Sequence, residues 1–358
     1  MIFNMEKFIE NIFAPQKGEI LTIMTDIPNN KEQDNPEWKE RRSMAEEWLE
    51  EIGKIAKKWD MQVNPLVTYK ATGNHNANLP EKCSIGDEKI KTSEIIDKST
   101  IILSMPEFSA TAPLSKHSTS SKKLRVGSMP GVAKFMENTG LAADYNKIAK
   151  KCDSLISFFN GAVGAEASFS TGHKCYFDLT KNEFHRDDGM LHPEAAGKEE
   201  SISNLPAGEV YTVPNENSNS LTEGELPFNE GNERGVFVIK ANKIVEIQGN
   251  LNEISNLKKQ MEEDPACRNI AEFAIGVNPK ATVTGNVLQD EKAGFHWAFG
   301  LSEHLGGTNG ESNFISPENV IHRDFVYAKG NVIECSLLEI IFEDKTKRTL
   351  IKNGELLI

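Results

Sequence analysis

Single acidic or imidazole side chains interrupt short apolar segments in the last third of this chain, and this pattern constrains its fold more than any other feature. The residues concerned are Glu209, Glu272, His296, His322 and Asp324. A charge in apolar surroundings is costly unless it is paired or bound to a cation. Carboxylates and imidazoles also hold hard or borderline divalent cations. We therefore predict that these segments converge on a site for two divalent metal ions.

Residues 294–300 show the pattern most clearly. Successive side chains of a β-strand face opposite sides, so His296 shares one side with two small residues, Ala298 and Gly300. The other side is aromatic and consists of Phe295, Trp297 and Phe299. The aromatic side is typical of a core, and the small residues leave space beside the imidazole. Taken alone, however, this pattern favours a hydrogen-bonded core histidine.

The other candidates lie on three further segments. His322 and Asp324 are two residues apart, so a strand directs both side chains to the same side. Glu272 is a single carboxylate in an apolar strand-like segment, and Glu209 directly follows a Pro-Ala-Gly turn. Taken alone, the pair on residues 322 and 324 favours an ordinary surface strand. Together, the four segments favour a metal site in one strand-rich domain.

Composition limits the class of protein and the kinds of partner. The 358 residues are 38% hydrophobic, which suits two globular domains of ordinary size. The net charge of −13 argues against nucleic acid or an anionic membrane, because phosphate binding needs clustered Lys and Arg. The five cysteines include no CxxC pair, which fits a reducing compartment. No signal peptide and no membrane-spanning run is recognisable, so we expect a cytoplasmic protein.

The first 150 residues alternate between strand and helix patterns. Apolar spacing predicts a helix over residues 36–60, beginning near Pro36. Strands are predicted at residues 19–25, 63–69, 100–104 and 123–126. Strands that are separated by helical crossovers form parallel sheets. We therefore predict an α/β domain over residues 1–152, with a parallel sheet and flanking helices.

The pattern changes after a predicted helix over residues 141–159, which we expect to link the two halves. Short strand-like segments separated by turns then predominate. Residues 215–235 are rich in Asn, Ser, Glu and Gly, and they are predicted to form an exposed loop. We predict that residues 153–358 form a strand-rich α+β domain that binds the metal ions and serves as the catalytic domain of an enzyme.

Four of these segments resemble motifs of the thermophilic aminopeptidase family, the T and S type of leucyl aminopeptidase. Residues 204–210 are similar to its NLP(A/T)GEV motif, and residues 271–276 are similar to its second glutamate motif. Residues 295–300 are similar to its (I/L)H-x-A-x-G motif, and residues 322–324 are similar to its terminal H-x-D motif. The order and spacing of the motifs agree, and the resemblance covers most of the chain.

The resemblance implies a metal-dependent exopeptidase with two domains, usually a homodimer, that uses zinc, cobalt or manganese. Such an enzyme removes the N-terminal amino acid from a small peptide with a metal-activated water. By motif match, the ligands of its two ions would be Glu209, Glu272, His296, His322 and Asp324. Glu303 and Glu311 are the candidates for a carboxylate that relays a proton.

The chain departs from the peptidase motif at one position. Peptidase members carry a tyrosine seven residues after the first motif histidine, whereas this chain has Glu303 there. In this respect it resembles the branch that includes the 2,5-dihydroxypyridine dioxygenases, which are mononuclear iron(II) ring-cleaving enzymes. Their iron ligands would map onto Glu209, His296, His322 and Asp324. His117 would then be the candidate for moving protons.

The sequence thus leaves two enzymatic functions open, an aminopeptidase and an iron(II) dioxygenase. A binding protein that has lost its chemistry is a third class. The intact set of candidate ligands argues against that class, because a protein that only binds has no need of them.

Overall fold

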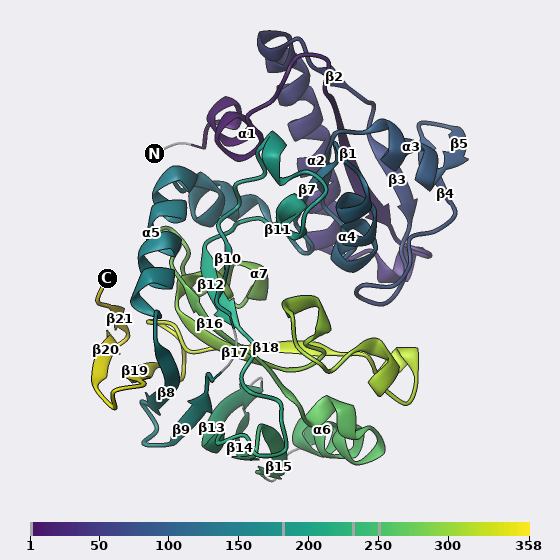
Figure 1. Cartoon of the computed structure of the whole chain (residues 1–358). Helices are drawn as coiled ribbons and strands as arrows, with labels where there is room; N and C mark the ends of the chain where they lie inside the picture. Colours follow the sequence, from purple (N-terminus) through teal and green to yellow (C-terminus); the bar gives the residue numbers. More distant parts are fainter. Residues whose placement is uncertain (1–2, 181–182, 231–232, 250–251) are drawn as a thin grey trace. The chain divides into compact units, whose positions relative to one another are not determined.

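The computed structural model describes residues 3–180, 183–230, 233–249 and 252–358. The chain forms two compact units (Figure 1). Unit 1 comprises Met1–Ala149, Asp187–Gly208 and Asn278–Lys280. Unit 2 comprises Lys150–Arg186, Glu209–Val277 and Ala281–Ile358. The division into domains at residues 152 and 153 stays a prediction, because compactness alone does not show where a domain folds independently.

Unit 1 contains a mixed sheet with a parallel centre. The order of its strands is β11-β7-β6-β1-β3-β4-β5, and β2 pairs with β1. The strands are β1 (Ile20–Ile27), β2 (Gln62–Val63), β3 (Val67–Lys70), β4 (Lys82–Ile85), β5 (Glu88–Lys91), β6 (Ile101–Ser104), β7 (Arg125–Ser128) and β11 (Ile202–Asn204). The pairs among β11, β7, β6, β1 and β3 are parallel, whereas β4 and β5 are antiparallel additions. The predicted parallel sheet is therefore confirmed.

Helices connect and cover the strands of unit 1. They are α1 (Met5–Phe13), α2 (Pro36–Ile55), α3 (Thr92–Lys98) and α4 (Thr111–Ser120). Asn35 caps α2 by accepting a hydrogen bond from the backbone N–H of Trp38, and Pro36 occupies the first turn, as the sequence predicts. The α-helix ends at Ile55, earlier than predicted, because a short 3₁₀ turn follows and Asp60 is left-handed.

The core of unit 1 lies on both faces of its sheet. Met24, Ile102 and Val126 form one cluster with Ile96 of α3 and Leu114 of α4. These two helices lie beside that face in Figure 1. The alternate residues of β6 and β7 face the other way, where Leu103 and Gly127 lie against Phe13 of α1. The sheet is thus covered on both sides, as expected for parallel strands.

Unit 2 consists of two antiparallel sheets. The first has the order β10 (His185–Asp187), β12 (Glu209–Thr212), β16 (Ile270–Gly276), β17 (Phe295–Gly300) and β18 (His322–Val326). The second has the order β15 (Lys243–Gln248), β14 (Glu233–Lys240), β13 (Glu223–Glu230), β9 (Lys174–Asp178), β8 (Ala162–Phe169), β19 (Cys335–Phe342), β20 (Lys347–Lys352) and β21 (Glu355–Leu356). The other α-helices among the described residues are α5 (Tyr145–Phe158), α6 (Asn252–Glu263) and α7 (Val287–Asp290).

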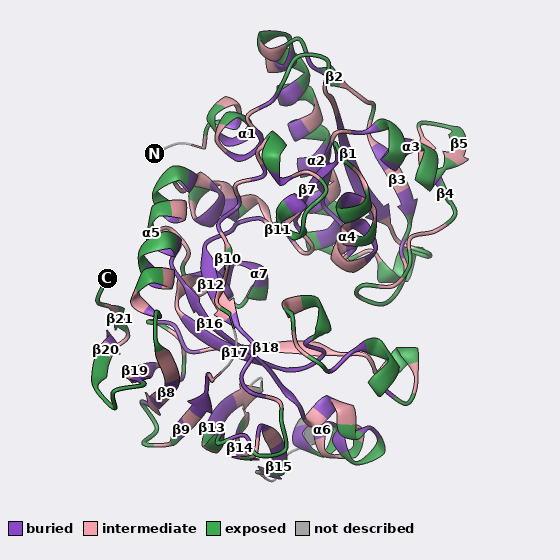
Figure 2. Cartoon of the chain, in the orientation of Figure 1, coloured by how far each residue is buried: buried purple, intermediate pink, exposed green. Residues whose placement is uncertain are grey.

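Aromatic side chains from the two sheets pack together to form the core of unit 2. Phe273 and Phe295 of the first sheet contact Phe177 of the second, with ring centroids 5.2 and 5.9 Å apart. Trp297 contacts Phe237 in the same way at 5.6 Å. Strands β16 and β17 are buried along their whole length (Figure 2). The aromatic side of residues 294–300 is therefore a core face, as predicted.

The predicted exposed loop over residues 215–235 is wrong in its second half. Residues 223–230 form β13, which pairs along its length with β14. Leu226 and Phe228 alternate toward the core and are buried there, which stabilises a strand despite the polar composition around them. Residues 231 and 232 lie outside the described residues.

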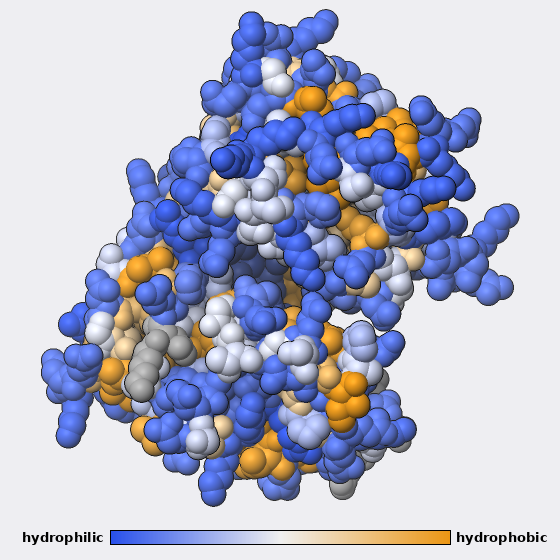
Figure 3. Space-filling view, turned by 45° about the vertical axis from the view of Figure 1, so that its right-hand side comes forward, coloured by the Kyte–Doolittle hydropathy of each residue, from blue (hydrophilic) through white to orange (hydrophobic). Residues whose placement is uncertain are grey.

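The described residues include no helix that is both long and apolar enough to cross a lipid bilayer. The face of the molecule in Figure 3 is mostly hydrophilic, with apolar side chains gathered only in separate small patches. Such scattered patches are ordinary for a folded surface and indicate no particular partner.

Candidate metal centre

The register of the first sheet of unit 2 places the five predicted ligands on one face. Glu272 of β16 pairs with Ala298 of β17, which in turn pairs with Asp324 of β18. His296 lies two residues from Ala298 in β17, and His322 lies two residues from Asp324 in β18. Glu209 of β12 lies opposite Gly276 of β16. These residues share one side of the sheet because each is an even number of positions from its neighbours. The aromatic core lies on the other side.

Three of the five side chains meet at one point. Nε2 of His322 lies 3.1 Å from Oε2 of Glu272 and 3.6 Å from Oδ1 of Asp324. One ligand atom from each of the three residues lies within 4.8 Å of the others. Bonds of about 2.0–2.2 Å to a cation would span such distances. The donor set and its spacing therefore fit a divalent cation.

The other two side chains lie directly beside this triad. Nε2 of His296 lies 3.4 Å from Oε2 of Glu209 and 3.8 Å from Oε1 of Glu272. His296 is almost fully buried, at 1% exposure. Ala274 and Ala298, the strand neighbours of His296 and Glu272, are small and leave room above the sheet. The five predicted residues thus form one continuous polar cluster.

The sequence analysis missed a buried lysine in this cluster. Nζ of Lys292 lies 2.6 Å from Oε1 of Glu209 and 2.8 Å from Oε1 of Glu291. The side chain of Lys292 is fully buried, which is rare for lysine unless it is paired. Its only signal in the sequence is a position four residues before His296, in a turn that reads as hydrophilic.

Mutual attraction shifts the pKa values of the cluster strongly. Burial opposes protonation of His296, but Glu209 and Glu272 outweigh it and raise the pKa of the imidazole to about 9. Burial likewise opposes ionisation of Glu209, but Lys292 and His296 lower its pKa to about 2. Against burial, Asp324 and Glu272 raise the pKa of His322 well above its ordinary value. These side chains thus form a set of ion pairs that a bound cation would replace.

One carboxyl of the cluster behaves differently. Burial raises the pKa of Glu291 to about 8, because the attraction of Lys292 is too weak to offset burial and the repulsion of Glu209 and Asp324. Glu291 is therefore able to carry a proton near neutral pH. Perturbed acids in a cluster of this kind are common at functional sites.

The loop after β17 is fastened by a carboxylate that the sequence analysis did not single out. Oε1 of Glu216 accepts hydrogen bonds from Ser302 and Asn269, and its Oε2 accepts one from the hydroxyl of Thr308. This loop holds the ring of His304 against His322, with centroids 4.8 Å apart. Glu216 thereby ties together Ser302 and Thr308, on either side of His304.

The predicted proton-transfer residues lie at two places. Glu303 and Glu311 are exposed, and the carboxylate of Glu303 lies against Gly310. His117 belongs to α4 of unit 1, where it borders a cavity of about 290 Å³ together with Lys116 and Glu81. The catalytic roles of all three stay predictions.

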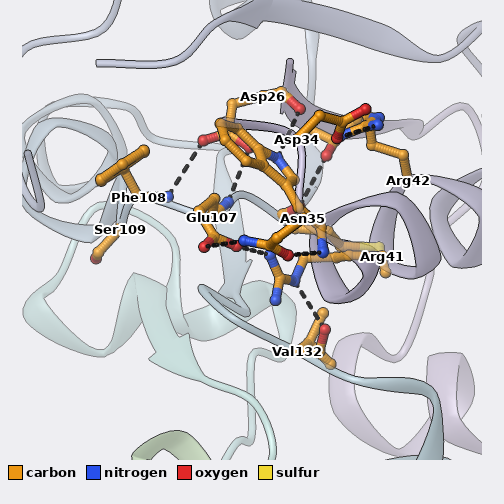
Figure 4. Close-up of polar contacts among 12 residues, drawn as sticks. Asp26, Asp34, Asn35, Arg41, Arg42, Glu107, Phe108, Ser109 and Val132 are labelled. Atoms are coloured by element: carbon orange, nitrogen blue, oxygen red, sulfur yellow. Dashed lines mark hydrogen bonds and ion pairs between the residues drawn. The ribbon is translucent and has the colours of Figure 1, made fainter. Parts of the chain in front are cut away.

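A second polar cluster lies in unit 1, at the carboxyl end of β1 (Figure 4). Asp26 accepts hydrogen bonds from the backbone N–H groups of Glu107 and Phe108 and from the indole of Trp38, at 2.8, 3.1 and 2.8 Å. Arg41 binds the Glu107 carboxylate and donates to the carbonyl of Val132. The contacts to Glu107, Phe108 and Val132 fasten segments that follow parallel strands, and the contact to Trp38 joins β1 to α2, so the cluster is explained by its structural role.

The comparisons with known proteins agree with this geometry. The family model of the thermophilic metalloproteases (M29) matches residues 133–325, more than half of the chain and the region that contains all five candidate ligands. The chain belongs to the thermophilic metalloprotease (M29) family. The resemblance inferred from the four sequence motifs is thereby confirmed, and membership in M29 implies a metal-dependent hydrolase with a divalent cation.

Two solved structures share the fold of nearly the whole chain. The structure of wild-type AmpT from Thermus thermophilus has a TM-score of 0.60 and 13% identity, with 99% of this chain and 98% of that chain covered. A 2,5-dihydroxypyridine dioxygenase from Pseudomonas putida KT2440 has a TM-score of 0.62 and 15% identity, with 99% and 96% covered. None of the curated protein sequences matches this chain. At these identities the two structures support the fold alone.

Proposed function

We propose that this protein is a metal-dependent aminopeptidase that removes N-terminal amino acids from small peptides. The observation that carries the proposal is the meeting of Glu272, His322 and Asp324 at one point, in a chain of the M29 family. A bound divalent cation, such as zinc, cobalt or manganese, would supply an activated water and polarise the scissile carbonyl. The remaining chemistry belongs to the side chains around it.

The candidate ligands have complementary roles in this proposal. Glu272, His322 and Asp324 would hold the cation, while Glu209 and His296 border the same space and would serve a second ion or the substrate. Nδ1 of His322 binds the carbonyl oxygen of Leu301, which leaves Nε2 for the cation. Two ions held by the five side chains is the arrangement that the sequence motifs imply.

Proton transfer requires a group that carries a proton near neutral pH. Glu291 has a pKa of about 8 and lies beside Lys292 and Glu209, so it meets this requirement. Glu303 and Glu311, the candidates from the sequence, are exposed and would have to approach the substrate from the loop. The abundance of carboxylates here suits a substrate with a positive amino terminus. Catalysis by a homodimer in the cytoplasm remains part of the proposal.

Peptide hydrolysis provides the test. Protein that is stripped by a chelator and reloaded with zinc, cobalt or manganese should release free amino acids from short unblocked peptides. N-acetylated peptides of the same sequence provide the matched control and should remain intact, because an aminopeptidase requires the free amino group. Absence of release with all three metals would reject the proposal.

A second candidate function is an iron(II) dioxygenase that cleaves a dihydroxylated ring. One observation favours it: Glu303 occupies the position at which the peptidase motif has tyrosine, and its side chain is exposed. A similar fold is adopted by the dioxygenase from Pseudomonas putida. In this case His296, His322 and a carboxylate would hold iron. Oxygen uptake with dihydroxypyridines that depends on ferrous iron would support this function, and peptide hydrolysis without oxygen uptake would exclude it.

A further inference from the structure

The carboxylate of Glu216, in the segment that follows β12, is the centre of a set of hydrogen bonds. Its Oε1 accepts from Nδ2 of Asn269 and from Oγ of Ser302, both at 2.6 Å. Its Oε2 accepts from the hydroxyl of Thr308 at 2.7 Å and from the backbone N–H of the same residue. A carboxylate can satisfy all four donors, whereas the single oxygen of an amide accepts at most about two.

The hydrogen bonds continue from Ser302 across the loop that follows β17. The N–H of Asn309 donates to Oγ of Ser302 at 3.1 Å, and the N–H of Ser302 donates to the carbonyl oxygen of Asn309 at 3.0 Å. Nδ2 of Asn309 donates to the carbonyl oxygen of Gly300 at 2.7 Å. Both Ser302 and Asn309 are buried. The two ends of this 301–310 loop are therefore joined to each other, and Glu216 binds both.

The 301–310 loop contacts the candidate ligand His322 at two points. The carbonyl oxygen of Leu301 lies 2.7 Å from Nδ1 of His322, and the ring of His304 packs edge-on against the same imidazole. The N–H of Leu301 also donates to the carbonyl oxygen of Ile321, directly before His322, at 2.7 Å. The orientation that directs Nε2 of His322 toward Glu272 therefore depends on where this loop lies.

We propose that Glu216 is a positioning residue of the candidate metal centre, on which it acts without supplying a ligand atom. By holding Ser302 and Thr308, it keeps the carbonyl of Leu301 at Nδ1 of His322 and so presents Nε2 to the triad. Loss of a group that orients a histidine ligand typically weakens metal binding by about 10- to 100-fold. The inference rests on the metal centre of the proposed function, but it adds a residue that belongs to none of the four motifs.

A purely structural carboxylate would affect stability and leave metal affinity unchanged. Asp26 provides the matched comparison, because it accepts hydrogen bonds from the indole of Trp38 and from the backbone of residues 107 and 108. It belongs to unit 1, whereas the five candidate ligands belong to unit 2. Asp26→Asn should therefore lower the free energy of unfolding without changing zinc affinity.

Zinc affinity is the first measurement, and it needs no substrate. Full-length protein is stripped by a chelator, and its zinc dissociation constant is determined by competition with a chromogenic chelator. Glu216→Gln should raise this constant about 10-fold or more, because the amide cannot accept from all four donors. Asp26→Asn should leave it within about twofold of the wild-type value, as expected for independent sites.

The Nδ1–H group of His322 provides a second measurement, which needs no metal. In nitrogen-15 NMR spectra of the stripped protein, its signal is assigned by its absence in His322→Gln. The signal should be protected from exchange with water in the wild-type protein and in Asp26→Asn, because the carbonyl of Leu301 accepts this proton. Glu216→Gln should lose that protection, an effect that a merely structural role would not produce.

Ser302→Ala covers a failure of Glu216→Gln to fold. It removes the hydroxyl between Glu216 and Asn309 and keeps the carboxylate, so it should weaken zinc binding in the same direction by a smaller factor. Because both residues act through one loop, the double variant should weaken binding by less than the product of the two factors. Wild-type zinc affinity in either folded single variant, or an equal loss in Asp26→Asn, would overturn the inference.

The outcome is separable from that of the proposed function. Zinc binding that depends on Glu216, in a protein that releases no amino acids from peptides, would keep this inference and reject the aminopeptidase. Peptide hydrolysis by a protein in which Glu216→Gln binds zinc as tightly as the wild type would do the reverse.

Discussion

Nδ1 of His322 lies 2.7 Å from the carbonyl oxygen of Leu301, and this contact sets the orientation of the ring. Because a carbonyl oxygen only accepts hydrogen bonds, Nδ1 carries the proton when the imidazole is neutral. Nε2 is then left with a lone pair, and it lies 3.1 Å from Glu272. Histidine ligands of metal ions are commonly oriented in this way by a backbone acceptor. The ring is therefore oriented with Nε2 toward the triad, where a cation would replace the proton of the imidazolium.

Asp324→Asn should weaken zinc binding by roughly 100-fold or more, because an uncharged amide replaces one of the three donors of the triad. The measurement is the zinc dissociation constant by competition with a chromogenic chelator. Asp344→Asn provides a matched control, since Asp344 lies in an exposed turn of the same unit. Equal affinities for the two variants would remove Asp324 from the ligand set.

Metal-free protein should lose stability as the pH rises from about 6.5 to 9. The pKa of His296 is about 9 in the folded chain, against an ordinary value of 6.5, so the folded state binds more protons in this range. The free energy of unfolding therefore decreases with increasing pH through this window. Urea titrations at several pH values measure it, and His296→Gln should show a smaller slope. An identical slope in that variant would show that another group is responsible.

The raised pKa of His322 predicts that zinc binds more tightly as the pH increases. A cation must displace the proton from His322, whose pKa is raised, and replace its ion pairs with Glu272 and Asp324. Calorimetric titrations in buffers of different ionisation enthalpy should therefore detect proton release on binding. Release should be absent at a pH well above the raised pKa values. Proton uptake instead of release would contradict the ion-pair description of the metal-free site.

Gly276→Ala should destabilise the protein by about 1–3 kcal/mol, because the added methyl group overlaps the backbone of residues 291 and 292. Gly53→Ala provides the opposite case. Gly53 is exposed within α2, nothing lies within 4 Å of where an alanine Cβ would stand, and alanine favours a helix by about 0.5–1 kcal/mol. Urea denaturation of both variants gives the comparison. A neutral Gly276→Ala would mean that the 291–292 turn yields easily.

Asp26→Asn should destabilise unit 1 by about 1–3 kcal/mol, because an amide replaces an oxygen that accepts hydrogen bonds from Trp38 or from the 107–108 backbone. Asp97→Asn on the exposed side of α3 is the control and should change stability by less than about 0.5 kcal/mol. Thermal unfolding monitored by tryptophan fluorescence follows the change, since Trp38 is one of the partners. A similar effect of both substitutions would rule out a special role for Asp26.

Alternation made the strands near the candidate site predictable. In residues 294–300, alternation places His296 and its aromatic neighbours on opposite sides of a strand. The structure has strand β17 there, with His296 on the side away from the aromatic residues. The pair on residues 322 and 324 is likewise in a strand. Strand β13 was missed because polar residues and Gly224 hide the alternation of Leu226 and Phe228. Local composition therefore misleads where only two side chains carry the apolar pattern.

Lys292 could not be found from local pattern. A lysine between Glu291 and Ala293 reads as part of a solvated turn, and its burial follows from contacts with β12 and β16, which are distant in sequence. The same holds for Glu216, whose partners lie 53 to 92 residues away. Such groups depend on tertiary contacts that periodicity does not encode. The five candidate ligands could be predicted because the family motifs mark residues that come together only in the folded protein.

The two-sided construction of β16, β17 and β18 has a consequence for how this architecture diversifies. Substitutions on the polar side of these strands leave the aromatic packing on the other side untouched, so the donor atoms can be exchanged without rebuilding the scaffold. A metalloprotease family and a dihydroxypyridine dioxygenase with a similar fold are what such interchangeability would produce. In an architecture of this kind, new reactivity can evolve while the fold is inherited unchanged.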